Sequence, residues 1–262
     1  ATLFAVGAMA MAMAACREDA NPGVTPLPVT SATAQATRKV PTPVVTPSTG
    51  GSADTRQPLV QGPSAKYAPS EADLLGFFRA SVPDTFSVNN EIFATIGPFL
   101  TPGEATDSIK LWGFAEGWVA NLEPEGLLSS VPKGAYFITS QVFLFTTGEG
   151  AERAFATFDK FYKDTTASEV QTTKPLANQS SAYRIEKGKV GSTPLDAVYH
   201  SFLFRRGNMV AVVRTFGGAP FMTVDAARDV AVMMDSRALG ERPSPLPTPG
   251  GAAPTVVGGA RP

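Results

Sequence analysis

The clearest local pattern in the chain is a pair of neighbouring strand-like segments, residues 196–206 and 208–216. Both are rich in Val, Phe, Leu and other strand-forming residues, and Gly207-Asn208 between them matches a two-residue turn. The sequence therefore predicts a β-hairpin whose register is set by the length of its turn. The facing pairs are expected to be Arg206–Met209, Arg205–Val210, Phe204–Ala211, Leu203–Val212, Phe202–Val213, Ser201–Arg214, His200–Thr215 and Tyr199–Phe216.

Because side chains alternate between the two faces of a strand, this register also sorts the hairpin into two surfaces. The first surface is almost wholly apolar and is predicted to face the core, through Phe202, Phe204, Ala211 and Val213. The second is mixed, and it predicts a partly open binding face made of Tyr199, Leu203, Arg205, Val212, Arg214 and Phe216. The alternative interpretation is that a helix covers this second surface and the arginines line its rim.

Other segments alternate between helical and strand patterns. Ser70-Glu71-Ala72-Asp73 has capping-box spacing and predicts a helix that ends before Pro83. Apolar residues three and four apart predict a helix through residues 151–162, and Ala135–Thr147, apolar on both faces, predicts a central strand. Further helices are expected at residues 103–112 and 224–240, and further strands at 113–121 and 181–186.

These elements place helices between groups of strands rather than in strict alternation with them. That order favours an α+β fold, with an antiparallel sheet of about five strands and flanking helices in a single domain. A strand, a Thr- and Gly-containing turn and a helix occur twice, after Val142 and after Val210. The similarity indicates either an internal duplication or simply a common arrangement.

Composition limits the folded part of the 262-residue chain, because many of its 23 prolines lie near the two ends. Proline-rich tracts bury too little apolar surface to offset their chain entropy. We therefore expect a disordered tether over residues 16–68, a globular domain over 69–240 and a disordered tail over 241–262.

The first fifteen residues carry no charge and consist mainly of Ala, Met and other small or apolar residues. This run is too short to cross a bilayer, and it suits the apolar region of a secretion signal whose basic start lies upstream. The tetrapeptide Met13-Ala14-Ala15-Cys16 resembles the lipobox of bacterial lipoproteins. The resemblance implies cleavage before Cys16, a lipid anchor on its sulfur and an extracytoplasmic location in the bacterial cell envelope.

Charge and cysteine content exclude several classes of protein. One cysteine and one histidine exclude a disulfide framework and a Cys- or His-rich metal site, and a net charge of −1 excludes a strongly basic nucleic-acid binder. Residues 69–150 carry three Lys or Arg against ten Asp or Glu, a net of −7, whereas residues 151–240 carry twelve against nine, a net of +3. We therefore expect an electrically lopsided domain.

Candidate catalytic groups are few. His200 is the one possible imidazole base, and its place inside a predicted strand favours a hydrogen-bonded core histidine. Glu116, Glu123 and Glu125 could form a glycosidase-like pair, although carboxylates near a turn are usually solvated. Trp112 and Trp118 suit core packing better than a ligand platform.

The sequence thus predicts no catalytic residue, metal site or cofactor. It favours a lipid-anchored, non-catalytic binding or accessory module of the cell envelope, which contacts the membrane through its anchor. An envelope protein, lipid or polymer would be its ligand, and nucleic acid would not. The alternative is a carboxylate-dependent hydrolase that acts on envelope material.

Overall fold

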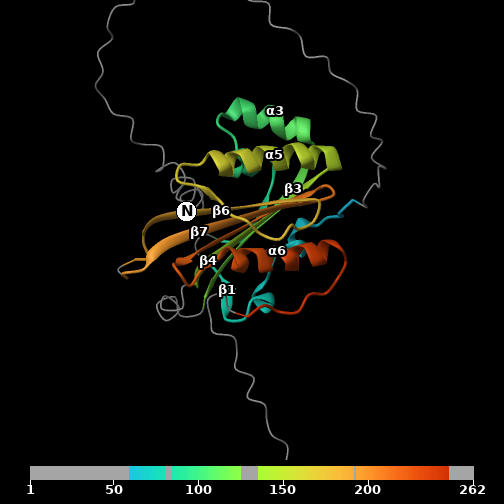
Figure 1. Cartoon of the computed structure of the whole chain (residues 1–262). Coiled ribbons are helices and arrows are strands. Elements are labelled where there is room, and N and C mark those ends of the chain that lie inside the picture. Colours follow the sequence, from blue (N-terminus) through green and yellow to red (C-terminus); the bar gives the residue numbers. More distant parts are fainter. Residues whose placement is uncertain (1–58, 81–83, 125–134, 192, 248–262) are drawn as a thin grey trace, which may run out of the picture.

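A computed structural model describes residues 59–80, 84–124, 135–191 and 193–247, which form a single α+β domain (Figure 1). The described helices are the 3-10 turns η1 (Ser64–Tyr67) and η2 (Glu71–Asp73) and the α-helices α2 (Asn90–Ile96), α3 (Pro102–Trp112), α5 (Gly148–Asp164) and α6 (Val224–Ala238). The described strands are β1 (Phe77–Arg79), β2 (Phe86–Val88), β3 (Phe114–Pro124), β4 (Ala135–Phe145), β5 (Glu169–Val170), β6 (Gln179–Lys189), β7 (Asp196–Arg206) and β8 (Met209–Gly218).

All the strands belong to one antiparallel sheet in the order β1-β3-β4-β8-β7-β6-β5, and β2 pairs with β3 beside β1. The described residues therefore contribute eight strands rather than the expected five or so. The three additional strands, β1, β2 and β5, have only two or three residues and lie at the edges of the sheet. Such short segments show too little alternation to be predicted from sequence.

The predicted hairpin is confirmed in full by β7 and β8, whose register pairs Arg206 with Met209 and every further pair as expected through Tyr199 and Phe216. The turn residue Gly207 has φ +54°, a left-handed conformation that glycine adopts without strain. The central position of β4, between β3 and β8, is also confirmed.

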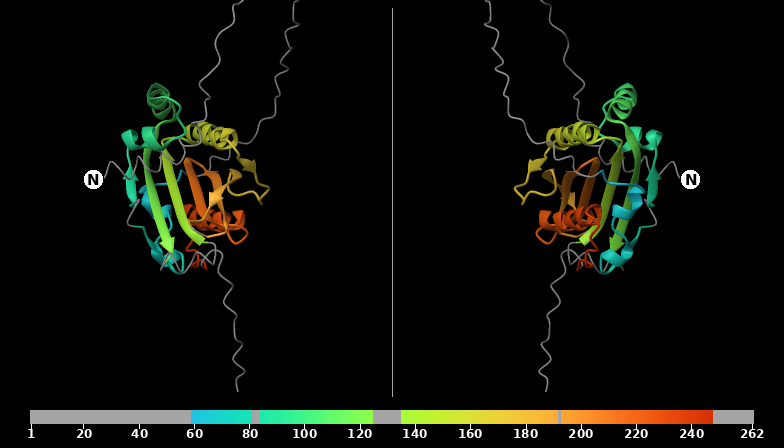
Figure 2. Two further views of the ribbon diagram at one scale, coloured as in Figure 1. Left: turned by 90° about the vertical axis from the view of Figure 1, so that its left-hand side faces the viewer. Right: turned by 90° about the vertical axis from the view of Figure 1, so that its right-hand side faces the viewer.

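Helices cover both faces of the sheet (Figures 1 and 2). One face packs against α6, in a core that contains Phe202, Phe204, Ala211 and Val213, as the sequence predicts. The opposite face packs against α5, with α2 and α3 beyond it, in a second core rich in phenylalanine. The hairpin is therefore buried on both sides over its middle, which explains why β4, β7 and β8 are apolar on both faces.

Helix α5 confirms the predicted apolar stripe: Ala151, Ala154, Phe155, Phe158 and Tyr162 are all buried. Its start is capped by Thr147, whose side chain accepts a 3.0 Å hydrogen bond from the backbone N–H of Gly150. Gly150 also permits close contact with α3, because a Cβ there would lie 1.9 Å from the carbonyl oxygen of Trp112. The helices expected at 103–112 and 224–240 correspond to α3 and α6.

The helix predicted after Ser70 is wrong. The capping box of Ser70 and Asp73 does form, but it opens only the 3-10 turn η2, and the chain then continues into β1. Phe77 pairs with Pro124 at the end of β3, so tertiary pairing overrides the local helical pattern.

Both predicted domain boundaries also differ from the structure. Val60 and Tyr67 are 7% and 4% exposed and belong to the α6-side core, although the sequence places them in the tether. At the other end, Leu246 forms a bridge with Leu74 and packs against the same core. The described part of the domain therefore spans residues 59–247, and the remaining parts of the expected tether and tail lie outside the described residues.

Candidate functional site

Helix α5 divides the predicted binding face into a buried part and a partly exposed part. Leu203 and Val212 have no exposed surface, because both lie in the core beneath α5. The prediction that they contribute to an open face is wrong. Arg205 lies near the turn, where its guanidinium donates to the side chain of Gln179 at 2.6 Å and to the carbonyl of Gly207 at 3.1 Å. These contacts give Arg205 a structural role.

The exposed part is a row of apolar side chains at the other end of the hairpin. Tyr199 is 42% exposed, and its ring stacks on that of Phe216 with 4.6 Å between centroids and 23° between planes. The register places Ile185 of β6 beside Tyr199 and Phe137 of β4 beside Phe216 on the same face, and both are half-buried. We call Ile185, Tyr199, Phe216 and Phe137 the aromatic row. Sequence analysis missed Ile185 and Phe137, because they belong to strands outside the predicted hairpin.

The length of α5 explains why this row is only partly covered. A helix of 17 residues is about 25 Å long, whereas a strand of 11 residues is about 36 Å long. The last buried residue of α5 is Tyr162, which stacks on Tyr183 of β6 at 5.9 Å. Tyr183 pairs with Ser201, one row before the aromatic row, so the strands continue where the cover of α5 ends.

Arg214 provides the positive charge beside the aromatic row. It precedes Phe216 by two residues on the same face of β8 and is half-buried. Its charge acts on Tyr162: burial raises the pKa of that phenol, and the nearby Arg214 partly offsets the rise. The exposed end of the sheet thus combines stacked aromatic rings with a guanidinium, a composition typical of binding surfaces.

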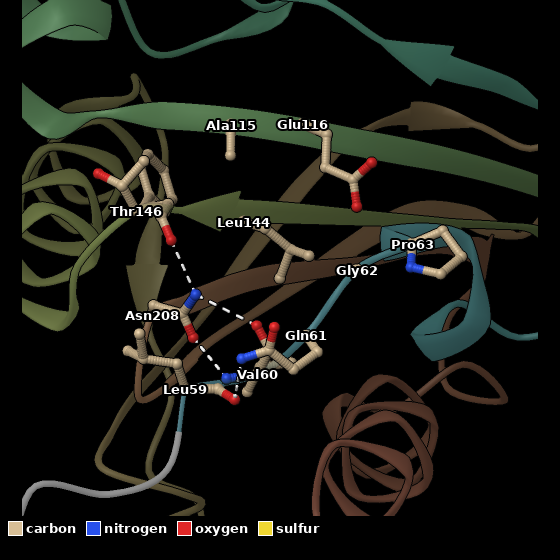
Figure 3. Close-up of a pocket in the computed structure, with 11 residues that line it drawn as sticks. Leu59, Val60, Gln61, Gly62, Pro63, Ala115, Glu116, Leu144, Thr146 and Asn208 are labelled. Carbon is tan, nitrogen blue, oxygen red and sulfur yellow. Dashed lines mark hydrogen bonds between the residues drawn. The ribbon is translucent and has the colours of Figure 1, made fainter.

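A pocket of about 550 Å³ lies on the α6 side, where the chain enters the domain (Figure 3). Asn208 closes its base: its side chain accepts a hydrogen bond from the N–H of Val60 at 2.6 Å and donates to the carbonyls of Val60 and Phe145 at 3.2 and 2.7 Å. Glu116 accepts a 2.7 Å hydrogen bond from the N–H of Ser64, which opens η1. The polar groups of the pocket thus hold the entering segment in place.

The carboxylates considered for catalysis do not form a pair. Glu116 and Glu123 are seven residues apart on β3 and point to opposite faces, so their Cα atoms are separated by about 23 Å at roughly 3.3 Å per residue. The carboxyl groups of a glycosidase lie no more than about 10 Å apart. Glu125 lies outside the described residues. Within the described ranges, no cluster of His, Cys, Asp and Glu could hold a metal ion.

His200 is a buried histidine on the α6 side, 4% exposed, as the sequence favours. Its Nε2 lies 3.3 Å from the carbonyl oxygen of Met222. Burial lowers the pKa of this imidazole below 6.5; the hydrogen bond to Met222 opposes that shift, and the charge of Arg184 adds to it. The residue is placed for packing rather than for contact with a substrate.

This lowered pKa makes the stability of the domain depend on pH. Below about pH 6.5 His200 becomes protonated in the unfolded chain, whereas in the folded chain its lowered pKa keeps it neutral to lower pH. Protonation therefore favours the unfolded chain, and the free energy of unfolding should decrease as the pH is lowered from 7.5 to 5. Urea unfolding across this range measures the effect. His200 is the chain's one histidine, so the variant His200→Gln should lose this dependence. An unchanged slope in the variant would assign the proton uptake to carboxylates.

The remaining candidates are structural or lie outside the described residues. Trp112 is 5% exposed in the α5-side core and Trp118 packs against the α6-side core, so their core placement is confirmed. Cys16 lies outside the described residues. Among the helices that the structure describes, none is long and apolar enough to cross a membrane.

Comparison with solved structures finds a likeness in fold. No family model matches the chain, and no curated protein sequence matches it. A solved structure with a similar arrangement is the extracellular domain of PknH from Mycobacterium tuberculosis, with a TM-score of 0.42 and 12% sequence identity. The alignment covers 71% of this chain and 100% of that chain. A likeness at this TM-score carries no argument about function.

Proposed function

We propose that this protein is a lipid-anchored, non-catalytic module of the bacterial cell envelope that binds an anionic lipid surface through Arg214 and the aromatic row. The observation that carries the proposal is the stacked pair of Tyr199 and Phe216 beside a guanidinium, at the end of the sheet that α5 leaves uncovered. Aromatic rings suit the boundary between water and lipid, and a guanidinium suits phosphate groups.

The position of the tether supports this proposal. If Cys16 carries the anchor, 42 residues separate it from Leu59, and a flexible chain of that length would have a root-mean-square reach of roughly 35 Å. The chain enters the domain at the Asn208 end of the hairpin. Phe216 lies eight residues further along β8, about 26 Å away at roughly 3.3 Å per residue. The tether is therefore long enough for the aromatic row to meet the membrane that holds the anchor.

The distribution of charge also supports an anionic ligand. The acidic segment, residues 69–150, supplies the strands at one edge of the sheet, and the segment with a net charge of +3 supplies β5 to β8 at the other. Figure 2 shows these two groups of elements on opposite sides of the molecule. Such a field would turn the basic side, and with it the aromatic row, toward negatively charged lipid.

Vesicle binding tests the surface. A soluble chain of residues 17–262 should sediment with vesicles that contain phosphatidylglycerol and less with vesicles of phosphatidylcholine alone. The double variant Tyr199→Ala with Arg214→Ala should reduce binding to the anionic vesicles about ten-fold or more, because it removes an inserted ring and a charge. Leu111→Ala is the matched control, since Leu111 is 64% exposed on α3 in the acidic part of the domain. Equal binding by the parent chain and the double variant would contradict the proposed surface.

The anchor has its own test. In bacteria that express the chain behind a secretion leader, the parent protein should partition into detergent, whereas Cys16→Ser should give a soluble or uncleaved protein. Metabolic labelling with a fatty acid should mark the parent and not the variant. Partitioning that does not change in Cys16→Ser would contradict lipidation, and it would leave the vesicle result, obtained without the anchor, unaffected.

A further inference from the structure

Two uncharged segments lie together at the end of the hairpin that bears the aromatic row. Residues 215–224 carry no charged side chain, and neither do residues 190–195. The two segments touch, because Leu195 lies against Gly218, where an added Cβ would be 2.8 Å from the leucine Cδ1. We call residues 193–195 and 218–222 the sheet tip.

Phe221 presents an exposed aromatic ring on this tip. Its side chain is 44% exposed, whereas the next residue, Met222, is 3% exposed and packs in the α6-side core. The backbone N–H groups of both residues donate to the carbonyl of Gly218, at 2.9 and 3.0 Å. A ring on a bend held in this way loses little further backbone freedom when a partner buries it, so the tip is prepared for binding.

The sheet tip and the aromatic row can meet one membrane. Phe216 and Arg214 precede Gly218 by two and four residues, which places them about 7 and 13 Å from the tip at roughly 3.3 Å per residue. The headgroup layer outside the hydrocarbon is about 5–8 Å thick. With the strands steep to the bilayer, Phe221 would reach the hydrocarbon and the aromatic row would lie at the headgroups. Arg214 would reach the phosphates through its long side chain.

The charges around the tip permit contact with anionic lipid. Asp196 is exposed beside the tip, and its carboxylate is paired with Lys189 at 2.5 Å. Asp225 lies in the first turn of α6, where the positive end of the helix dipole partly offsets its charge. The negative charges nearest to the tip are therefore compensated in full or in part, and Arg214 adds a positive one.

We propose that the sheet tip inserts Phe221 into the membrane, so that the domain meets the bilayer with the end of its sheet. This inference rests on the proposed function, and it adds the depth and the orientation of binding to it. The two contributions differ physically: burial of an apolar ring is not screened by salt, whereas the attraction between Arg214 and anionic lipid is.

Tryptophan fluorescence of the chain of residues 17–262 tests the insertion. With vesicles that contain phosphatidylglycerol, the added tryptophan of Phe221→Trp should shift its emission to shorter wavelength and be quenched by lipids brominated on their acyl chains. Leu111→Trp is the matched control: this position is 64% exposed on α3, and its tryptophan should neither shift nor be quenched. The spectrum of the parent chain is subtracted from both. In sedimentation, Phe221→Ser should weaken binding about three- to ten-fold.

Vesicle binding by the parent chain separates this proposal from the proposed function. If the parent chain binds but the tryptophan of Phe221→Trp neither shifts nor is quenched, the insertion is wrong and the aromatic row alone meets the lipid. Equal quenching in Phe221→Trp and Leu111→Trp would mean that the domain has no preferred orientation, which also overturns the insertion. If the parent chain does not bind, the proposed function is wrong and the insertion with it.

Discussion

A chain shortened to residues 69–240 is expected to be about 2–4 kcal/mol less stable toward urea than a chain of residues 59–247. The shorter chain loses the buried side chains of Val60 and Tyr67, whose burial contributes about 3–6 kcal/mol, partly offset by the chain entropy that is regained. It also removes the backbone partners of Asn208 and Glu116. For a domain of this size, the corresponding fall in melting temperature is about 5–15 °C.

Single substitutions separate this packing effect from a general effect of shortening the chain. Val60→Ala should cost about 1–2 kcal/mol, because it removes buried methyl groups. Leu59→Ala is the matched control, because Leu59 is the neighbour of Val60 and its side chain is 47% exposed. This substitution should lower the free energy of unfolding by less than about 0.5 kcal/mol. Equal stabilities of the two shortened chains would mean that the entering segment packs too weakly to belong to the domain.

The second large effect is expected in the centre of the sheet. Phe202→Ala should lower the free energy of unfolding by about 3–5 kcal/mol, because Phe202 has no exposed surface and its truncation leaves a cavity between β7 and α6. Leu203→Ala, on the face covered by α5, should cost about 2–5 kcal/mol for the same reason. Urea unfolding monitored by circular dichroism measures both losses.

The double variant Tyr199→Ala with Arg214→Ala is the counterpart of these core changes. It alters the exposed end of the same hairpin and should cost about 1 kcal/mol or less. This comparison decides how the vesicle experiment is interpreted, because loss of binding is informative only in a folded protein. If the double variant unfolds as readily as Phe202→Ala, the aromatic row is part of the core and the proposed surface does not exist.

The sequence was most informative where neighbouring residues set the structure. A two-residue turn at Gly207-Asn208 admits one register, so every facing pair of the hairpin could be predicted. The apolar stripe of α5 was equally clear, because its apolar residues recur at spacings of three and four residues along a 17-residue helix. The segment after Ser70 is too short for a repeating apolar pattern. Its pairing with the end of β3 makes residues Phe77–Arg79 a strand rather than part of a helix.

The candidate site was predictable only in part. Alternation along β7 and β8 identified the two faces correctly, but both faces are apolar, and nothing local indicates how far a helix covers either of them. Tyr199 and Phe216 were placed on one face by sequence, whereas the exposure of Tyr199 and the partial exposure of Phe216 follow from where α5 ends. Leu203 and Val212 share that face and are buried, because α5 crosses the sheet above them.

The sequence by itself determined the α+β class, the hairpin and its register, the main helices and the unequal charge of the two halves, because each depends on local spacing or on composition. The tertiary structure alone decided the domain boundaries and the extent of the exposed surface. Val60 belongs to a two-residue apolar segment, Leu59-Val60, in a proline-rich stretch, and its backbone is held by Asn208, 148 residues away in the chain. Contacts between such distant residues form only when the sheet and its covering helices are assembled, so no local pattern records them.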